Sequence, residues 1–304
     1  MRKGTLISLA FIVTMGMVLA ACGGATDNSG ENSTEETNNN NDQDAEDGNG
    51  TITLVYDNWA DQIASSHVLK KAMEDRGFTV ELTTATISAS WAGVADGSAD
   101  VLLAAWLPIT HNEYYERFKD QLVDLGPNTE GAKIGLVVPE YVTIDSIEEL
   151  NHNADKFNNQ IVGVEPGAGI MQRSEKATDE YGLELELMTS SEAGMMSELQ
   201  RNYDSEEWIV VTGWTPHWKF AKFDLKFLED PQGVFGETEE IHTIVRQGLE
   251  DDNPGAYKVL DNFHWTLDDM NEVMVDMEDG MEPEEAAAKW VENNQDQVEE
   301  WFVE

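Results

Sequence analysis

Basic residues and cysteine are scarce in this sequence. The 304 residues include one cysteine and 18 Lys and Arg, against 60 Asp and Glu. A single cysteine cannot form a disulfide within a monomer, so no disulfide framework supports the fold. The formal net charge of −42 is spread along the whole chain. A field of that sign repels nucleic acid and anionic membrane surfaces, which excludes both as partners of the folded part.

Motifs of metal and nucleophile chemistry are also missing. The chain has no CxxC, HExxH or EF-hand pattern, so we expect no metal and no cofactor. No Gly-x-Ser-x-Gly elbow frames a nucleophile, and His217 has no nucleophile near it in sequence. Without a nucleophile, base and oxyanion set, the chain is predicted not to be an enzyme. The absence of internal repeats argues against a structural or adhesive surface protein.

The acidity itself has two interpretations. A densely acidic surface keeps a protein hydrated and soluble in high salt or alkali, and a negative field also attracts a cationic ligand. Long-range fields are screened within about 8 Å at physiological salt, which favours environmental adaptation, whether to salt or to alkali, as the reason for most of the charge. Charge alone therefore does not identify the ligand.

The N-terminus has the layout of a secretory signal. Arg2 and Lys3 precede an apolar run from Leu6 to Ala21, which is shorter than the roughly 20 residues of a transmembrane helix. Small residues directly before Cys22 resemble the bacterial lipobox, in which the cysteine is acylated. We therefore predict a signal peptide over 1–21, lipidation at Cys22, and an extracytoplasmic protein anchored to the cell membrane only through its lipid.

A polar segment separates this anchor from the folded part. Residues 23–50 contain eight acidic residues, no basic residue and no aromatic one. Such a segment cannot bury enough apolar surface to offset its chain entropy. Residues 22–50 are predicted to be a disordered acidic tether, which leaves 51–304 for one large domain or two smaller lobes.

Strand and helix patterns alternate along the folded part, which predicts an α/β protein with a largely parallel sheet. Strand patterns occupy 51–56, 78–82, 100–105, 134–138, 161–164, 183–188 and 208–212. Helix patterns occupy 61–76, 90–96, 144–151, 171–181, 191–203, 250–260, 267–278 and 284–302. We predict lobe I over 51–143, lobe II over 144–240, and a helical part over 241–304 that packs on lobe I.

Unusual motifs follow the predicted strands, where ligands of open α/β sheets bind. They are Asp57-Asn-Trp59, Trp106-Leu-Pro-Ile-Thr-His111, Glu165-Pro-Gly-Ala-Gly-Ile170 and Gly213-Trp-Thr-Pro-His-Trp218. A trimethylammonium group has no N–H to donate, so aromatic faces bind it through cation–π attraction. A carboxylate instead needs N–H donors, such as a helix start and a histidine. Two lobes that present these loops to each other would form a cleft that closes by a hinge.

The sequence contains both halves of such a site. A single tryptophan after a strand is more often part of the core, and a glycine turn before a helix is common. Three strand-end tryptophans together with an anion-binding turn at 166–170 and the nearby His111 form a more specific set. The other tryptophans have plainer interpretations. Trp208 lies in a predicted strand, Trp265, Trp290 and Trp301 lie in the helical tail, and Trp91 and Trp218 are core or supporting candidates.

These motifs resemble the glycine betaine/proline betaine-binding proteins of osmoprotectant ABC importers. The resemblance is carried by Gly163-Val-Glu-Pro-Gly-Ala-Gly-Ile-Met171, Thr212-Gly-Trp-Thr-Pro-His-Trp218, Ala105-Trp-Leu-Pro-Ile-Thr-His111 and Glu240-Ile-His-Thr-Ile244. It implies a two-lobed periplasmic-binding-protein fold, type II-like, with a hinged ligand cleft. Members of the family occur with the two blocks in either sequence order.

The resemblance also implies individual roles. Trp59, Trp106 and Trp214 would form an aromatic cage, and the carboxylate would bind the backbone N–H groups of Gly169 and Ile170 and the side chain of His111. It implies a monomer that captures glycine betaine, or a related quaternary-ammonium solute, and delivers it to an ABC permease. Choline, carnitine and proline betaine are the alternatives, because the cages that bind them differ only by a methyl group or a ring.

Overall fold

The computed structural model describes residues 50–303. The predicted signal peptide, Cys22 and all of the predicted tether except Gly50 lie outside the described residues. Within the described part, no helix combines the length and the apolar character that a membrane crossing requires.

The first elements alternate as the sequence predicts. Helix α2 ends at Gly97, which adopts the left-handed conformation (φ 78°) that glycine tolerates best. Helix α3 was not predicted. The elements are β1 (Thr51–Tyr56), α1 (Ala60–Glu74), β2 (Thr79–Thr84), α2 (Ile87–Asp96), β3 (Val101–Leu107) and α3 (Asn112–Phe118).

The middle of the chain departs from the prediction in several places. The strand predicted over 134–138 extends over Leu122–Pro139, the strand predicted over 183–188 covers only Glu186–Met188, and the short helix Lys219–Lys222 and the strand Leu225–Phe227 were not predicted. In place of the helix predicted over 144–151, the chain forms a 3₁₀ segment over Ile147–Glu149, with a capping box between Ser146 and Glu149, and a second 3₁₀ segment that begins at Asn151 and ends at Phe157. The strand predicted over 208–212 begins only at Val211, so Trp208 precedes it and packs on Phe157. The elements are β4 (Leu122–Pro139), η1 (Ile147–Glu149), η2 (Asn151–Phe157), β5 (Gln160–Val162), α4 (Gly169–Glu180), β6 (Glu186–Met188), α5 (Glu192–Asp204), β7 (Val211–Thr215), α6 (Lys219–Lys222) and β8 (Leu225–Phe227).

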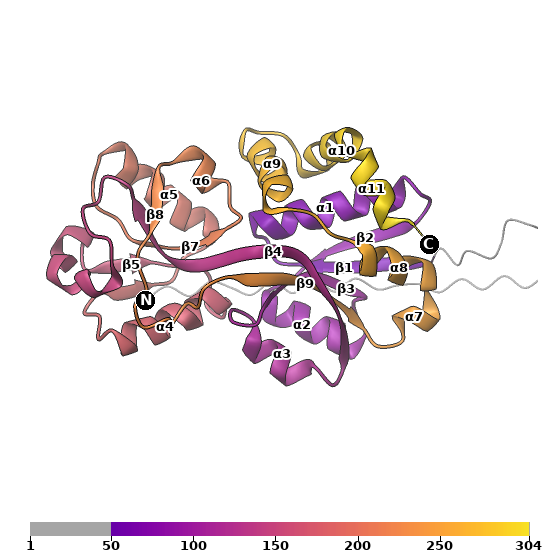
Figure 1. Ribbon diagram of the computed structural model, residues 1–304, viewed down its shortest axis with the longest axis horizontal. Coiled ribbons are helices and arrows are strands. Elements are labelled where there is room, and N and C mark those ends of the chain that lie inside the picture. Colours follow the sequence, from indigo (N-terminus) through magenta and orange to yellow (C-terminus); the bar gives the residue numbers. More distant parts are fainter. Residues whose placement is uncertain (1–49, 304) are drawn as a thin grey trace, which may run out of the picture. The chain divides into compact units, whose positions relative to one another are not determined.

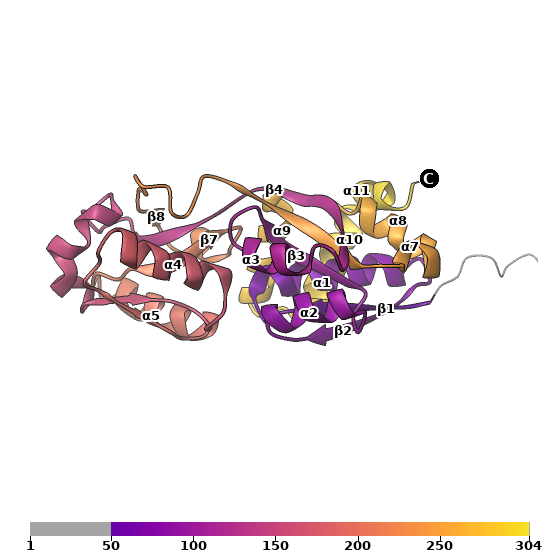
Figure 2. The ribbon, with the colours of Figure 1, turned by 90° about the horizontal axis from the view of Figure 1, so that it is seen from below.

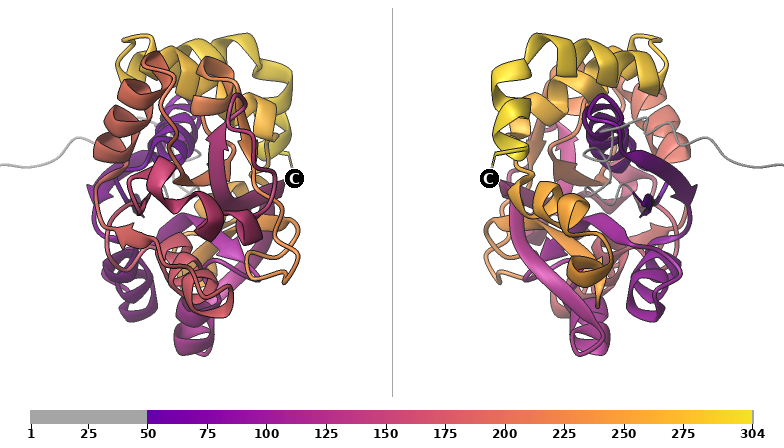
Figure 3. Two further views of the ribbon diagram at one scale, coloured as in Figure 1. Left: turned by 90° about the vertical axis from the view of Figure 1, so that its left-hand side faces the viewer. Right: turned by 90° about the vertical axis from the view of Figure 1, so that its right-hand side faces the viewer.

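The last third of the chain packs against the elements formed by its first third. An unpredicted strand, β9, is followed by helices that pack on α1; Figure 3 shows α9 to α11, in gold and yellow, over the indigo α1. Trp290 and Trp301 stack in this layer with ring centroids 6.0 Å apart. The elements are β9 (Glu239–Arg246), α7 (Leu249–Asp252), α8 (Pro254–Asn262), α9 (Leu267–Glu278), α10 (Pro283–Asn293) and α11 (Gln295–Trp301).

Within residues 50–303, nine strands form one connected sheet of order β2-β1-β3-β9-β4-β7-β5-β6, with β8 paired to β4. The outer pairings, β1 with β2 and β3 and β5 with β6 and β7, are parallel. All pairings of β4 and β9 are antiparallel. The prediction of a largely parallel sheet is therefore only half right. Strands β4 and β9 are the two connections between the parts of the sheet, run antiparallel to their neighbours and do not belong to βαβ units.

Strand β4 divides the sheet into two parts. Its residues from Leu122 to Ala132 pair with β9, and those from Lys133 to Val137 pair with β7. We call the part with β1–β3, β9, α1–α3 and α7–α11 lobe I, and the part with β5–β8 and α4–α6 lobe II. Figures 1 and 2 show β4, together with the segment that leads into β9, running from one lobe to the other.

Candidate functional site

A small cavity lies where residues of both lobes meet. Its volume is only about 20 Å³, so the lining side chains stand close together around it. The lining residues are Trp59, Asp61, Trp106, Thr110, His111, Ile134, Ile170 and Trp214.

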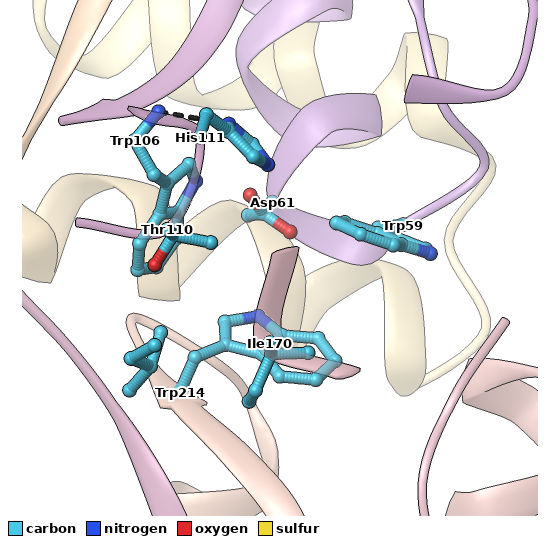
Figure 4. A pocket seen from close by; sticks show the side chains of 8 residues that line it. Trp59, Asp61, Trp106, Thr110, His111, Ile170 and Trp214 are labelled. Atoms are coloured by element: carbon cyan, nitrogen blue, oxygen red, sulfur yellow. Dashed lines mark hydrogen bonds between the residues drawn. The ribbon is translucent and has the colours of Figure 1, made fainter. Parts of the chain in front are cut away.

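The structure brings the three predicted cage tryptophans together at this cavity (Figure 4). Trp59 is the N-cap residue of α1, Trp106 is the penultimate residue of β3, and Trp214 is the penultimate residue of β7. All three are buried, at 6%, 3% and 4% exposure. The ring centroids of Trp59 and Trp214 lie 5.9 Å apart with their planes at 38°. Three tilted indoles around one space can surround a methylated cation.

The predicted glycine turn leads into helix α4 beside the cavity. Gly167 adopts a φ of 92°, which lets the chain turn sharply, and α4 then begins at Gly169. The N-cap residue, Ala168, gives the helix no side-chain acceptor. Ile170 lines the cavity, and Gly169 packs against Thr110 from lobe I. The first N–H groups of this 12-residue helix are therefore placed to bind an anion.

His111 is a preset hydrogen-bond donor. The backbone N–H of Trp106 donates to His111 Nδ1 at 3.0 Å, which fixes the proton of the neutral ring on Nε2. Nε2 is buried and has no hydrogen-bond partner within residues 50–303. Burial lowers the pKa of His111 to about 3, so the ring is neutral at physiological pH. A buried N–H without a partner at the cavity wall calls for an acceptor on the ligand.

Asp61 is a residue of the cavity that the sequence analysis missed. It lies on the first turn of α1, is 2% exposed, and its Oδ1 has no hydrogen-bond partner in the described part of the chain. Burial, and secondarily the charge of Glu192, raise its pKa to about 7, while Lys219 acts in the opposite direction. The sequence signal was the acid two residues after Trp59, which is also what an ordinary helix start shows.

Thr110 was missed as well, together with the residue that holds it. The Glu239 carboxylate accepts hydrogen bonds from the backbone N–H groups of Ile109 (2.7 Å) and Thr110 (2.5 Å) and from the Thr110 hydroxyl. Burial raises the pKa of Glu239, and these hydrogen bonds oppose the shift. Glu239 is the first residue of β9, so the loop between Trp106 and His111 is fixed to the strand that joins the two lobes.

The remaining candidates support the site without lining the cavity. Trp91 is fully buried, stacks on Tyr114 and meets the His111 ring edge-on at 6.2 Å. Trp218 is half-buried on a surface groove. His217 is buried and hydrogen-bonded to Glu192, and its ring meets that of Trp214 edge-on at 4.9 Å without lining the cavity itself.

Direct contacts between the lobes surround the cavity. The Tyr114 hydroxyl donates to the Gly167 carbonyl oxygen at 2.8 Å, and the Arg173 guanidinium donates to the Ile109 carbonyl oxygen at 2.6 Å. These hydrogen bonds join α3 and the Trp106–His111 loop of lobe I to the glycine turn and α4 of lobe II. Residues 50–303 contain no group of three or more His, Cys, Asp or Glu side chains placed to hold a metal ion.

Residues 50–293 match the family OpuAC, described as the substrate binding domain of ABC-type glycine betaine transport systems. The chain belongs to this family. It is 54% identical over 150 residues to the glycine betaine/carnitine transport binding protein GbuC of Listeria monocytogenes serotype 1/2a (strain 10403S). That alignment spans 48% of this chain and 50% of GbuC, so the chain matches about half the length of this curated relative.

Solved structures extend the likeness over both lobes. Lactococcal OpuAC in its closed-liganded conformation with glycine betaine is 45% identical with a TM-score of 0.81, over 83% of this chain and 99% of that one. The glycine betaine/L-proline-binding protein ProX of Borrelia burgdorferi is 39% identical with a TM-score of 0.81, over 84% and 97%. A choline-binding protein in complex with choline is 26% identical with a TM-score of 0.77, over 83% and 91%. The predicted two-lobed α/β fold is confirmed.

Proposed function

We propose that this OpuAC-family protein captures glycine betaine outside the cytoplasm and delivers it to an ABC permease for osmoprotectant uptake. The observation that carries the proposal is the juxtaposition of three buried indoles with the unpartnered His111 Nε2–H at one small cavity. This combination matches a ligand that has a methylated cation at one end and a carboxylate at the other.

The cation binds among the indole faces of Trp59, Trp106 and Trp214. Its charge is spread over methyl groups, which need desolvated π surface rather than hydrogen-bond acceptors. Asp61 beside the indoles adds a negative charge when its carboxyl group is ionised, and a bound cation favours that form. Hydrated metal ions and ammonium groups with N–H donors are poorly matched to this lining.

The carboxylate binds N–H donors that come from both lobes. The backbone N–H groups of Gly169 and Ile170, at the start of α4, and the His111 Nε2–H supply three donors. Because burial keeps His111 neutral by lowering its pKa, it contributes a directed hydrogen bond rather than a full charge. The N-terminal end of the α4 dipole supplies the favourable potential.

Choline is the main alternative ligand, because the choline-binding relative shares the fold. Choline has a hydroxyl group in place of the carboxylate, so it would leave most of the three donors unsatisfied. Carnitine and proline betaine retain a carboxylate, so they differ from glycine betaine mainly in size. The donor set supports glycine betaine over choline.

The test is calorimetric titration with glycine betaine, proline betaine, carnitine and choline. We expect saturable binding that is tightest for glycine betaine and weakest for choline. No heat at millimolar glycine betaine, or a preference for choline, would overturn the proposal.

We also propose the predicted processing and organisation. Signal-peptide removal after residue 21, lipidation of Cys22 and a tether to residue 50 would hold a monomer at the membrane. The predicted division of the folded part is 51–143, 144–240 and 241–304, with the last of these packed on the first. The contacts of α9 and α10 with α1 support the last point. A Cys22→Ser variant is expected to appear in the medium or periplasm, and wild-type protein in the membrane fraction.

A further inference from the structure

Glu192 is a buried carboxylate that lies outside the cavity and joins the two lobes. It is the first residue of α5 in lobe II and is 8% exposed. One carboxylate oxygen, Oε1, lies 2.9 Å from His217 Nε2, and the other, Oε2, accepts a hydrogen bond from the backbone N–H of Ala60 at 3.2 Å. Ala60 is the first residue of α1 in lobe I.

The hydrogen-bond direction at His217 is fixed. The backbone N–H of Lys219 donates to His217 Nδ1 at 3.0 Å, so the neutral ring carries its proton on Nε2 and donates it to Glu192. Both oxygens of Glu192 thus accept from fixed donors: a backbone amide, and a histidine ring held in place by its own hydrogen bond to the backbone. His217 follows Trp214 by three residues, which ties Glu192 to the loop that carries one of the cage tryptophans.

Helix α1 needs this contact because of the residue that precedes it. Ser, Thr, Asp or Asn at the N-cap normally accepts a hydrogen bond from the first turn. Here the N-cap residue is Trp59, which makes no side-chain cap. The position that a capping side chain would take is used for Trp59, and Glu192 of the other lobe accepts instead from the first amide of the helix, that of Ala60.

A second carboxylate of lobe II holds Trp59 itself. The Trp59 Nε1–H donates to Glu165 Oε2 at 3.2 Å, and the backbone N–H of Glu192 donates to Glu165 Oε1 at 3.3 Å. The two glutamates therefore fix the indole and the first turn of its helix as one unit.

The surrounding charges keep Glu192 available as an acceptor. Burial raises its pKa, and the Lys219 ammonium opposes the shift. The Lys219 Nζ is fully buried, lies 4.0 Å from the centre of the Trp214 ring and has no hydrogen-bond partner within residues 50–303. Burial lowers the pKa of Lys219 to about 7, and the carboxylates of Glu192 and Asp61 oppose that shift, so Lys219 is a counter-charge for this cluster while it is protonated.

We propose that Glu192 is a latch of the closed cleft: a positioning residue of lobe II that caps helix α1 of lobe I and thereby fixes Trp59 against the bound ligand. This inference rests on the proposed capture of glycine betaine. The latch forms only when the lobes close, so it slows ligand release and contributes little to ligand entry.

The test compares Glu192→Gln with Glu198→Gln, an exposed glutamate of the same helix. The introduced glutamine side chain has one acceptor oxygen, so one of the two donors faces an N–H₂ group. Stopped-flow tryptophan fluorescence is expected to show glycine betaine dissociating about tenfold faster from Glu192→Gln, with an association rate within about twofold of wild type. The ligand-free melting temperature of Glu198→Gln should match that of wild type, and so should its association and dissociation rates for glycine betaine.

A measurement on the unmodified protein gives a second criterion. Exchange of the Ala60 amide hydrogen, followed by NMR, should slow on addition of glycine betaine, and this slowing should disappear in Glu192→Gln. An unchanged dissociation rate in Glu192→Gln, an equal loss in Glu198→Gln, or an Ala60 amide insensitive to ligand would overturn the latch. If wild-type protein does not bind glycine betaine, the proposed function fails instead.

Discussion

The Cα of Gly169 lies directly against the Thr110 carbonyl group: a β-carbon at position 169 would collide with the oxygen, the carbonyl carbon and the methyl group of that threonine. Gly169 opens helix α4 in lobe II, and Thr110 belongs to lobe I. The lobes can approach this closely only because position 169 has no side chain. The contact also sets the distance between the α4 amides and His111 across the cavity.

Gly169→Ala is therefore expected to prevent full closure. We predict that its affinity for glycine betaine falls at least about tenfold, while the ligand-free melting temperature stays near that of wild type, because separated lobes leave room for the methyl group. Calorimetric titration and thermal melting measure the two quantities. Gly255→Ala is the control, since a β-carbon there meets Phe78 at an ordinary 3.7 Å. Wild-type affinity in Gly169→Ala would refute this role of the contact.

Loss of one cage indole should weaken binding without unfolding the protein. Trp106→Ala or Trp214→Ala is predicted to reduce affinity at least tenfold, about 1.4 kcal/mol, because a desolvated cation–π contact is lost. Trp290→Ala serves as the comparison: it removes a buried ring of the C-terminal helices, so it lowers stability but leaves the affinity of the folded fraction unchanged. Equal affinity losses in all three variants would indicate misfolding rather than a cage.

His111 should make stability depend on acid pH. Its folded-state pKa of about 3 lies below the unfolded value of about 6.5. Above pH 6.5 neither state is protonated at this residue; as the pH falls, the unfolded chain takes up a proton that the folded ring resists. The contribution of His111 is thus complete above pH 6.5 and is lost progressively toward pH 3, by about 2 kcal/mol at pH 5.

The comparison protein is His111→Asn, whose amide oxygen can still accept from the Trp106 N–H. Urea unfolding is measured from pH 7 to 4.5. Below pH 6.5 the free energy of unfolding should fall with pH less steeply for this variant than for wild type, and the two slopes should differ by about 1.4 kcal/mol per pH unit. Parallel curves for the two proteins would mean that His111 is accessible to protons in the folded state.

The net charge of −42 predicts a salt response. Like charges repel in the compact state, and molar salt screens that repulsion, so the melting temperature should rise as NaCl is added. The affinity for glycine betaine should change less than the melting temperature, because the cavity residues are desolvated. A melting temperature that falls steadily with salt would contradict the adaptation interpretation of the charge.

The sequence predicted best those helices and strands whose ends carry recognisable capping or turn residues. The helix over 267–278 was predicted at its observed bounds, and Thr266 and Asp269 form a capping box at its start. Strand β9 was missed because its partners in β3 and β4 lie more than 100 residues away in sequence. Strand β4 was predicted only over 134–138, since Gly126, Pro127 and Gly131 read as breakers; they lie near register shifts that a bulged strand tolerates.

The three tryptophans and the glycine turn that lie at the cavity could be singled out from the sequence, because tryptophan and glycine at strand ends are uncommon enough to be informative. The buried charged residues could not. Asp61, Glu192 and Lys219 occupy helix starts, where charged residues are ordinarily exposed, and here tertiary packing buries them. Their function depends on distances across the cleft, which no local pattern encodes.

Lobe II leaves and rejoins lobe I at one place in the sheet, where Ala132 of β4 pairs with Glu239 of β9. Everything between these two residues is a single continuous insertion that brings Trp214, Gly169, Ile170 and Glu192 with it. This segment can therefore be exchanged as one piece. A chimera that takes it from a choline-binding relative would keep lobe I and the two points at which the segment joins it, and would exchange all the ligand-binding residues of lobe II in one step.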